Sequence, residues 1–538
     1  MAVILLVGVF ISSYFILSAL YNLFLHPLRS VPGPFFCKIS TLPSFYHACI
    51  GDRHVWLWQL FQVYGSRIRV SPNIVLFNTP TANNAIFSYR PSVKKSEFYA
   101  AWPRKANEVN TLCVTDVKEH ARRRKMLGQA FTETSTKAAG KIAERHIERW
   151  DELLLAGSNQ GENEGWTPPR NMAEWTGNLF FDIMGDMAFG KQFDVKETGF
   201  ESQFKNMPVL VESYMKFMYP ILKSPLLHPF VWLKPRGLNR LFDAISPPNV
   251  TKYWEFVDTA VAERVKLEKI LESTAEKPTP PNRDWFSFLL AIRDESGTQG
   301  LSLEDLTAEA SLLVIAGHDT SATATCATFF YLAHNPRVQA KLAKEIRSTF
   351  TSPEDIVYGP KLSSCTYLRA CIDESLRLAH PAPSELERIV TGSGLTVDGN
   401  FYPPGTALGT PNFALYRNES VFGDAYTYRP ERWIVSHDLD TLNTAEDVKR
   451  IKDSFFPFSK GVGNCVGQAI AVLQMSLVVA RTVWRAEVRV VEGETVGEGN
   501  EGLGWGQRDR RLFVYRDVYT TVREGPVVEF RRWGEGDE

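Results

Sequence analysis

Cysteine is scarce in this sequence, with seven in 538 residues, and no two of them form a Cys-x-x-Cys pair. Small disulfide-built domains carry a far higher density of cysteine, and zinc ribbons need that spacing. Cys365 and Cys371 are close in sequence but have no histidine at ligand spacing. We interpret them as buried free thiols. The chain is therefore neither a disulfide scaffold nor a zinc ribbon.

An excess of charge of one sign is also missing. The chain has 60 basic and 61 acidic residues, a net charge of −1, and no long block of like charge. A nucleic-acid-binding protein would need a basic patch or tail, so we expect no nucleic-acid partner. With 44% hydrophobic and 22% charged residues, the composition is that of a globular protein and excludes a disordered or fibrous chain.

Charged side chains are absent from residues 1–28, where an apolar run extends from Val3 to Leu25. About 20 apolar residues suffice for a helix to cross a bilayer. A signal peptide would have a basic start and a shorter apolar core, and a core helix would show a polar stripe. The sequence predicts a transmembrane anchor over 1–25. The first cations, Arg29 and Lys38, follow the run, which places the rest of the chain in the cytosol.

The rest of the chain shows no internal repeat and no change in composition that would mark a second domain. Val31-Pro32-Gly33-Pro34 cannot continue a helix, so we expect a stiff, proline-rich hinge over 26–45 and one domain over 46–538. Periodicity predicts a mainly α fold with small β-sheets, including a hairpin from 67–70 and 74–77. The clearest helix begins after Ser302, with Asp305 at the capping-box position, and runs to about Leu332. A helix of this length with small apolar residues is expected to pass through the centre of the protein.

Two groups of residues allow both a functional and a purely structural interpretation when each group is taken alone. Ala316-Gly317-His318-Asp319-Thr320 lies in the long helix, where glycine costs about 1 kcal/mol relative to alanine and where a carboxylate needs a partner. This segment could let the helix lie close to a flat ligand and relay protons to it. It could equally consist of an Asp at the protein surface and a Thr in the core. Glu374 and Arg377 share one face of a helix from about Ser364 to Leu378. Arg432 is placed to complete a network with them.

The third constellation is the segment Phe456-Pro-Phe-Ser-Lys-Gly-Val-Gly-Asn-Cys-Val-Gly467. A cysteine, Cys465, stands in a glycine-rich loop directly before an apolar helical pattern. The loop amides and the helix N-terminus would stabilise a thiolate. A dinucleotide fingerprint would need different glycine spacing after a strand, and an inert buried cysteine would not explain three glycines.

At these residues the sequence resembles the cytochrome P450 monooxygenases. The likeness rests on the acid–alcohol pair, the Glu-x-x-Arg pair, Pro430-Glu-Arg-Trp433 and the Phe-x-x-Gly…Cys-x-Gly loop, in the family's order and at its distances. It covers nearly the whole chain. The hinge and the ending Glu524–Phe530 are similar to those of membrane-bound enzymes of filamentous fungi, many of which serve secondary metabolism.

The resemblance implies a role for each matching residue. Cys465 would be the axial thiolate ligand of the iron of haem b, and such a ligand favours O–O cleavage. Thr320 and Asp319 would organise proton delivery. The remaining cofactor contacts that it implies are His120 and Arg124 at the propionates, Arg388 as a further propionate partner, Phe458 beside the thiolate, and the close-approach glycines Gly317, Gly461 and Gly467. Glu374, Arg377 and Arg432 would form a structural network behind the haem.

One position departs from the family pattern. Two residues before the cysteine, where the family usually has a basic residue, this chain has Gly463. A buried carboxylate without a partner is costly, so the propionate would rely on His120, Arg124 and Arg388, recruit Lys460, or stay in solvent. Two functions follow: a monooxygenase that oxidises a lipophilic small molecule, or a haem protein that Gly463 has disabled.

The resemblance also implies partners. The chain has no flavin or dinucleotide motif, so NADPH–cytochrome P450 reductase would supply electrons, docking near Arg122, Arg123 and Lys125; a solvated cationic face would explain these residues equally well. An endoplasmic-reticulum membrane is implied. The entry lid would lie at 207–232, and residues 98–114 and 381–386 would line the pocket.

Overall fold

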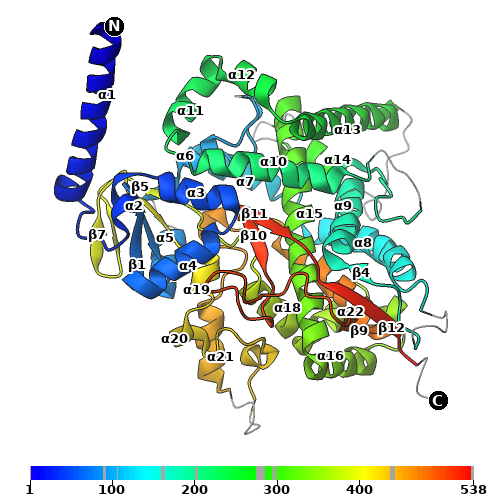
Figure 1. Ribbon diagram of the computed structural model, residues 1–538. Coiled ribbons are helices and arrows are strands. Elements are labelled where there is room, and N and C mark those ends of the chain that lie inside the picture. Colours follow the sequence, from blue (N-terminus) through cyan, green and yellow to red (C-terminus); the bar gives the residue numbers. More distant parts are fainter. Residues whose placement is uncertain are drawn as a thin grey trace.

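The computed structural model describes residues 2–534, with gaps at 89–91, 106, 159–163, 200–203, 274–284, 294–296, 298–299 and 437–442. The fold is mainly helical with small sheets, as expected (Figure 1). The helices are α1 Ala2–Leu20, α2 Phe35–Ile39, α3 Leu42–Ile50, α4 Arg53–Tyr64, α5 Pro80–Phe87, α6 Glu97–Ala100, α7 Val117–Leu127, α8 Glu133–Leu154, α9 Met172–Phe189, α10 Met207–Leu222, α11 Leu227–Leu233, α12 Leu238–Ile245, α13 Pro248–Ser273, α14 Trp285–Leu290, α15 Leu303–His334, α16 Pro336–Thr349, α17 Pro360–Ser363, α18 Thr366–Leu378, α19 Asn412–Leu415, α20 Glu419–Phe422, α21 Ala445–Asp453 and α22 Gln468–Arg485.

The strands form four small sheets. The largest has the order β1-β2-β8-β5-β3, in which only β2 and β8 are parallel. The predicted hairpin is confirmed as its β1–β2 edge. The other sheets have the orders β4-β12-β9, β10-β11 and β6-β7. The strands are β1 Arg67–Ser71, β2 Ile74–Phe77, β3 Val93–Lys95, β4 Arg170–Asn171, β5 Arg388–Val390, β6 Leu395–Val397, β7 Asn400–Tyr402, β8 Ala407–Gly409, β9 Ala486–Val490, β10 Tyr515–Val518, β11 Thr520–Arg523 and β12 Val527–Arg532.

Helix α15 is the central element of the fold and runs through the middle of the molecule (Figure 1). The predicted capping box is confirmed: the Ser302 side chain accepts from the Asp305 amide, and the Asp305 side chain accepts from the Ser302 amide. The helix ends at His334, because Asn335-Pro336 cannot continue it. Its 32 residues pack against α9, α18 and α22.

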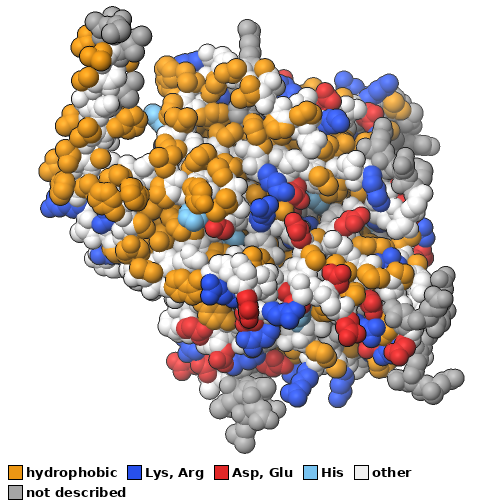
Figure 2. Space-filling model, viewed as in Figure 1, with side chains coloured by type: hydrophobic (Ala, Val, Ile, Leu, Met, Phe, Trp, Pro, Cys, Tyr) orange, Lys and Arg blue, Asp and Glu red, His pale blue; other side chains and the backbone are white. Residues whose placement is uncertain are grey.

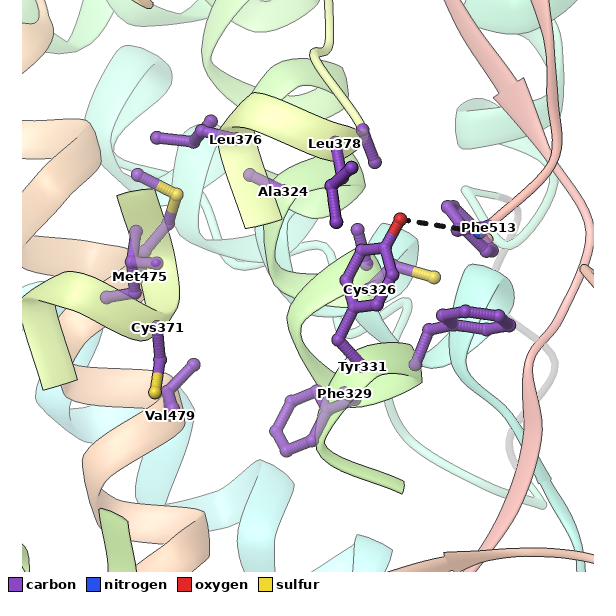
Figure 3. Packing of buried hydrophobic residues seen from close by; sticks show 14 of the residues in the cluster. Ala324, Cys326, Phe329, Tyr331, Cys371, Leu376, Leu378, Met475, Val479 and Phe513 are labelled. Carbon is purple, nitrogen blue, oxygen red and sulfur yellow. Dashed lines mark hydrogen bonds between the residues drawn. The ribbon is translucent and has the colours of Figure 1, made fainter. Parts of the chain in front are cut away.

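The second half of α15 lies in the main hydrophobic core. Figure 3 shows this packing, in which α15 supplies Ala324, Cys326, Phe329 and Tyr331, α18 supplies Cys371, Leu376 and Leu378, and α22 supplies Met475 and Val479. The Tyr331 hydroxyl accepts the backbone N–H of Phe513 at 3.4 Å, which satisfies a polar group that burial would otherwise leave costly. Cys365 and Cys371 are buried free thiols, as predicted.

The N-terminal helix stands apart from the body of the protein (Figure 1). Leu5–Leu25 is long and apolar enough to cross a membrane, by length and composition, and 6% of the span is buried. Figure 2 shows apolar side chains on α1 and on the neighbouring face of the domain. Large apolar residues exposed on α2, α3, α11 and α12 include Phe36, Tyr46, Trp232 and Ile245. A patch of this kind marks an interaction surface.

The hinge is fixed against the largest sheet. The Arg69 amide of β1 donates to the Pro32 carbonyl at 2.7 Å. A Cβ on Gly33 would lie 2.4 Å from the Arg69 carbonyl oxygen, so the close approach of these two backbones requires glycine. The buried Arg69 guanidinium also donates to the Asn22 carbonyl at 2.9 Å. The end of the N-terminal apolar segment is thereby tied to the first strand.

Candidate active site

One large cavity of about 390 Å³ lies beside the first half of α15, a size typical of a small-molecule site. The predicted pocket segments both contribute, with Tyr99 and Trp102 from the first and Pro381 and Leu386 from the second. In the predicted lid, α10 contributes Tyr214 and Met215. The wall is mostly apolar and aromatic.

Cys465 faces this cavity from the loop before α22. Its amide donates to the Phe458 carbonyl at 2.8 Å, which closes the loop. Gly461 has φ of 62°, a backbone conformation that residues with a side chain rarely adopt. Gly467 is the residue directly before α22. Burial raises the pKa of the Cys465 thiol, and the Gly467 amide and the Arg124 guanidinium act in the opposite direction.

Four basic residues from three elements converge at this end of the cavity: Lys95 of β3, His120 and Arg124 of α7, and Arg388 of β5. Arg124 Nη2 donates to Asn464 Oδ1 at 2.7 Å. Burial and the neighbouring cations lower the pKa of His120 to about 4 and that of Lys95 to about 7. At neutral pH His120 is therefore uncharged, and the positive charge comes from Arg124, Arg388 and part of the Lys95 population. This charge fits a buried anionic group, because an anion would relieve the repulsion.

Thr320 and Asp319 take different positions around α15. Thr320 lines the cavity, and its hydroxyl donates to the Ala316 carbonyl at 2.5 Å. The Asp319 carboxylate instead accepts from Arg523 Nη1 at 2.8 Å, and the same nitrogen donates to Thr323 Oγ1 at 2.8 Å. The carboxylate thus has the partner that its burial requires. Arg523 belongs to β11, and no local pattern in the sequence indicated this pair.

Gly317 lies against a neighbouring helix as well as the cavity. The resemblance implied that it gives room for a flat ligand, and it does line the cavity. However, a Cβ on Gly317 would lie 2.5 Å from Sδ of Met184 in α9. The missing side chain therefore also makes room for Met184, which lines the same cavity, and the close approach of a flat ligand at Gly317 stays a prediction.

The Glu374 network is confirmed and is fully buried. Glu374 accepts from Arg377 Nη2 at 2.9 Å, from Arg432 Nε at 2.8 Å and from the Trp433 indole at 2.9 Å. All three charged side chains are 0% exposed. Burial opposes ionisation, but Arg377 and Arg432 hold the pKa of Glu374 below its usual value. The network fastens α18 to the turn Pro430–Trp433.

The cations expected at the reductase-docking face are not equivalent. Arg122 is exposed and pairs with Glu119 at 2.8 Å. Arg123 is 12% exposed, pairs with Asp305 at 2.7 Å and donates to the Val109 carbonyl. It therefore anchors the loop above the cavity, and including it in a docking surface was wrong. Lys460 also reaches a protein partner, because its Nζ donates to Asn84 Oδ1 at 2.6 Å.

Sequence reasoning missed Glu309, a buried carboxyl of α15 that holds the same loop. Its Oε1 accepts the amide and the hydroxyl of Thr111 at 2.7 and 2.6 Å. Burial raises the pKa of Glu309 to about 7. A polar residue in a mostly apolar helix was the available signal, but its partner lies 198 positions away.

This shift predicts a pH dependence of stability. The unfolded chain loses the Glu309 proton near pH 4.3, while the folded chain keeps it until about pH 7. The stabilisation by the protonated form is complete below the unfolded pKa and is lost as the pH rises through the folded pKa. We expect Glu309→Gln to flatten the fall in unfolding temperature between about pH 5 and about pH 7.5. Glu255→Gln, at an exposed site on α13, should keep the wild-type slope; an unchanged slope in Glu309→Gln would contradict this assignment.

A helical fold crossed by one long helix, with a cysteine loop and a cluster of cations around one apolar cavity, defines a haem-binding oxidoreductase. The chain belongs to the cytochrome P450 family, whose model matches residues 31–512. It is 32% identical to cytochrome P450 monooxygenase fscF of Fusarium equiseti, over 97% of this chain and 95% of the relative. It is 30% identical to poxM of Penicillium oxalicum, covering 97% and 94%, and 30% identical to AKT7 of Alternaria alternata, covering 95% and 94%. The protein is therefore an oxygen-incorporating oxidoreductase that uses haem b with a cysteine thiolate ligand.

Proposed function

We propose that the protein inserts one oxygen atom from O2 into a lipophilic small molecule, by hydroxylation, epoxidation or a related oxidation, in a fungal secondary-metabolite pathway. The observation that carries this proposal is the single cavity onto which Cys465, Thr320 and the cation cluster all open. Its apolar and aromatic wall favours a lipophilic substrate. The likeness to monooxygenases of three fungi supports the biological setting.

The residues present suit haem b. Bound haem with a thiolate ligand supplies the activation of O2. Cys465 would hold the iron, and Arg124, Arg388 and His120 would face the carboxylates. The Thr320 hydroxyl is placed to hold and pass a proton at the cavity wall. Asp319, which pairs with Arg523, would exchange protons on the side of α15 that faces β11. The apolar wall would exclude bulk water from the reacting centre.

The function is tested by turnover of the membrane-bound protein with NADPH, a cytochrome P450 reductase and a panel of lipophilic compounds under 18O2. Entry of one labelled oxygen atom into a product is the expected result. NADPH oxidation without any labelled product across the panel would favour the haem protein without turnover. Comparison of metabolites between a deletion strain and its parent would then identify the substrate.

Thr320→Ala is expected to lower labelled product on the order of 10²-fold, the usual contribution of a positioned proton donor, while NADPH oxidation continues. The matched control is Thr349→Ala in α16, because Thr349 makes the same bond to a carbonyl four residues earlier, at 2.7 Å, away from the cavity. Equal product per NADPH in Thr320→Ala and wild type would remove Thr320 from proton delivery.

We propose that the protein is anchored by 1–25 in the endoplasmic-reticulum membrane with its catalytic domain in the cytosol, where the reductase docks. Arg29 and Lys38 follow the apolar helix, which favours this orientation. The exposed apolar face near α1 supports contact with the same membrane. Protease added to intact microsomes should digest the domain; full protection until detergent is added would contradict the orientation.

A further inference from the structure

The cavity wall contains a continuous row of aromatic rings. Its four members, which all line the cavity, are Tyr519, Trp102, Tyr214 and Trp254. The ring centroids of Tyr519 and Trp102 are 5.4 Å apart, and those of Trp102 and Tyr214 are 6.1 Å apart. Those of Tyr214 and Trp254 are 5.5 Å apart. We call these four side chains the aromatic row, and each comes from a different element or loop of the fold.

Tyr519 joins the row from the tip of the hairpin β10–β11, whose strand β11 packs against α15 (Figure 1). Val518 pairs with Thr520 across the hairpin, so Tyr519 is the residue that makes the turn. Its φ is 82°, a left-handed conformation that a bulky side chain adopts only at a cost in free energy. Such strain persists where the surrounding structure enforces it, and it is concentrated at functional sites.

The buried carboxyl group of Asp517 enforces this conformation. Asp517 Oδ1 accepts the backbone N–H of Tyr519 at 3.0 Å. Asp517 Oδ2 accepts the Ser384 hydroxyl at 2.5 Å and the hydroxyl of Tyr219, on α10, at 3.1 Å. Asp517 is 0% exposed. The turn is therefore fixed by a side chain that is itself held at both oxygens.

The Tyr519 ring is thereby kept at the cavity wall. Its centroid is 5.1 Å from that of Phe98, which is buried, whereas Tyr519 is partly exposed and lines the cavity. Burial, followed by the neighbouring Tyr99 phenol, holds the pKa of Tyr519 well above its usual value, so the ring is neutral at physiological pH. A flat unsaturated molecule can stack on such a row or meet it edge to face, whereas a saturated ring gains no such contact.

We propose that Tyr519 is a specificity-determining residue, that Asp517 is its positioning residue, and that the aromatic row selects substrates with a planar, unsaturated carbon skeleton. This inference rests on the proposed function and names the substrate class of the same site. It gives the strained turn a purpose, because a relaxed backbone at position 519 would direct the side chain elsewhere.

The test is the binding of two matched probes to the haem-loaded, full-length protein, measured by equilibrium dialysis. The probes are 2-naphthol and decahydro-2-naphthol, which share a carbon skeleton and a hydroxyl group but differ in unsaturation. We expect wild type to bind 2-naphthol about 5-fold more tightly, the order expected for one or two aromatic contacts. The readout is the change of this ratio between proteins, because the hydration of the free probes is the same in every experiment.

Tyr519→Leu keeps an apolar side chain but removes the ring, so we expect the ratio to fall about 3-fold. Asp517→Ala removes the acceptor of the Tyr519 amide and should lower the ratio in the same way. Tyr519→Phe, which keeps the ring, and Asp517→Asn, which keeps an oxygen acceptor, should both retain the wild-type ratio.

Phe401→Leu is the matched control for the loss of an aromatic ring. Phe401 lies on β7, is 62% exposed and is outside the cavity lining, so this variant should keep the wild-type ratio. General damage to packing would weaken the binding of both probes and leave their ratio unchanged. Circular dichroism of each variant reports folding independently.

Each outcome has one meaning. A wild type that does not favour 2-naphthol, or an unchanged ratio in Tyr519→Leu, would overturn the proposed substrate class. An unchanged ratio in Asp517→Ala, even with weaker binding of both probes, would overturn the positioning role of Asp517. A wild type that keeps the ratio but gives no labelled product with any compound under 18O2 would instead overturn the proposed function.

Discussion

Cys465→Ser is expected to abolish the thiolate-type Soret band of the ferrous carbon monoxide complex and to reduce monooxygenation to the level of the haem-free chain. Serine keeps the size of the side chain but supplies no thiolate, and the thiolate is the property that favours O–O cleavage. The measurement is the difference spectrum of the membrane-bound protein, together with labelled product formation.

A second cysteine provides the matched control. Cys113 also lines the cavity, but it lies outside the glycine-rich loop before α22. Burial raises the pKa of its thiol to about 12, and no glycine-rich loop surrounds it to favour a thiolate. Cys113→Ser should keep the thiolate-type band. Loss of the band in Cys113→Ser and its retention in Cys465→Ser would transfer the ligand to the other wall of the cavity.

Glu374→Ala is expected to give the largest loss of stability, about 3–5 kcal/mol, because it leaves two buried guanidinium groups without their carboxylate. The measurement is the unfolding temperature of the detergent-solubilised protein, with the yield of folded protein as a second readout. The network lies outside the cavity lining, so any remaining folded protein should retain the spectrum of wild type.

Asp453→Ala is the comparison for this variant. Asp453 pairs with Lys449 at 2.6 Å, but both side chains are more than half exposed, and such a pair contributes little to stability because solvent screens it. A similar loss of stability in both variants would mean that the buried network stabilises the fold no more than an exposed ion pair does.

The cofactor-binding loop and the central helix could be predicted because their signals are local. Ser302 and Asp305 cap a helix within one turn, and Cys465 lies within three residues of the helix that follows it. The Glu374–Arg377 pair lies within a single turn, and the hairpin β1–β2 joins neighbouring segments. The partners that sequence reasoning missed were distant: Asp319 and Arg523 are 204 positions apart.

The sequence by itself determined the family, the apolar N-terminal helix, the cysteine loop and the capped helix α15, since each depends on residues that are near in the chain. Only the tertiary structure decided that Arg388 fills the space beside Gly463, that Arg523 neutralises Asp319, and that Arg123 turns inward to hold a loop. The physical reason is that a charge is placed by the packing of elements far apart in sequence. The absence of a cation at position 463 is visible in the sequence, whereas the position of Arg388 beside this loop depends on where strand β5 lies.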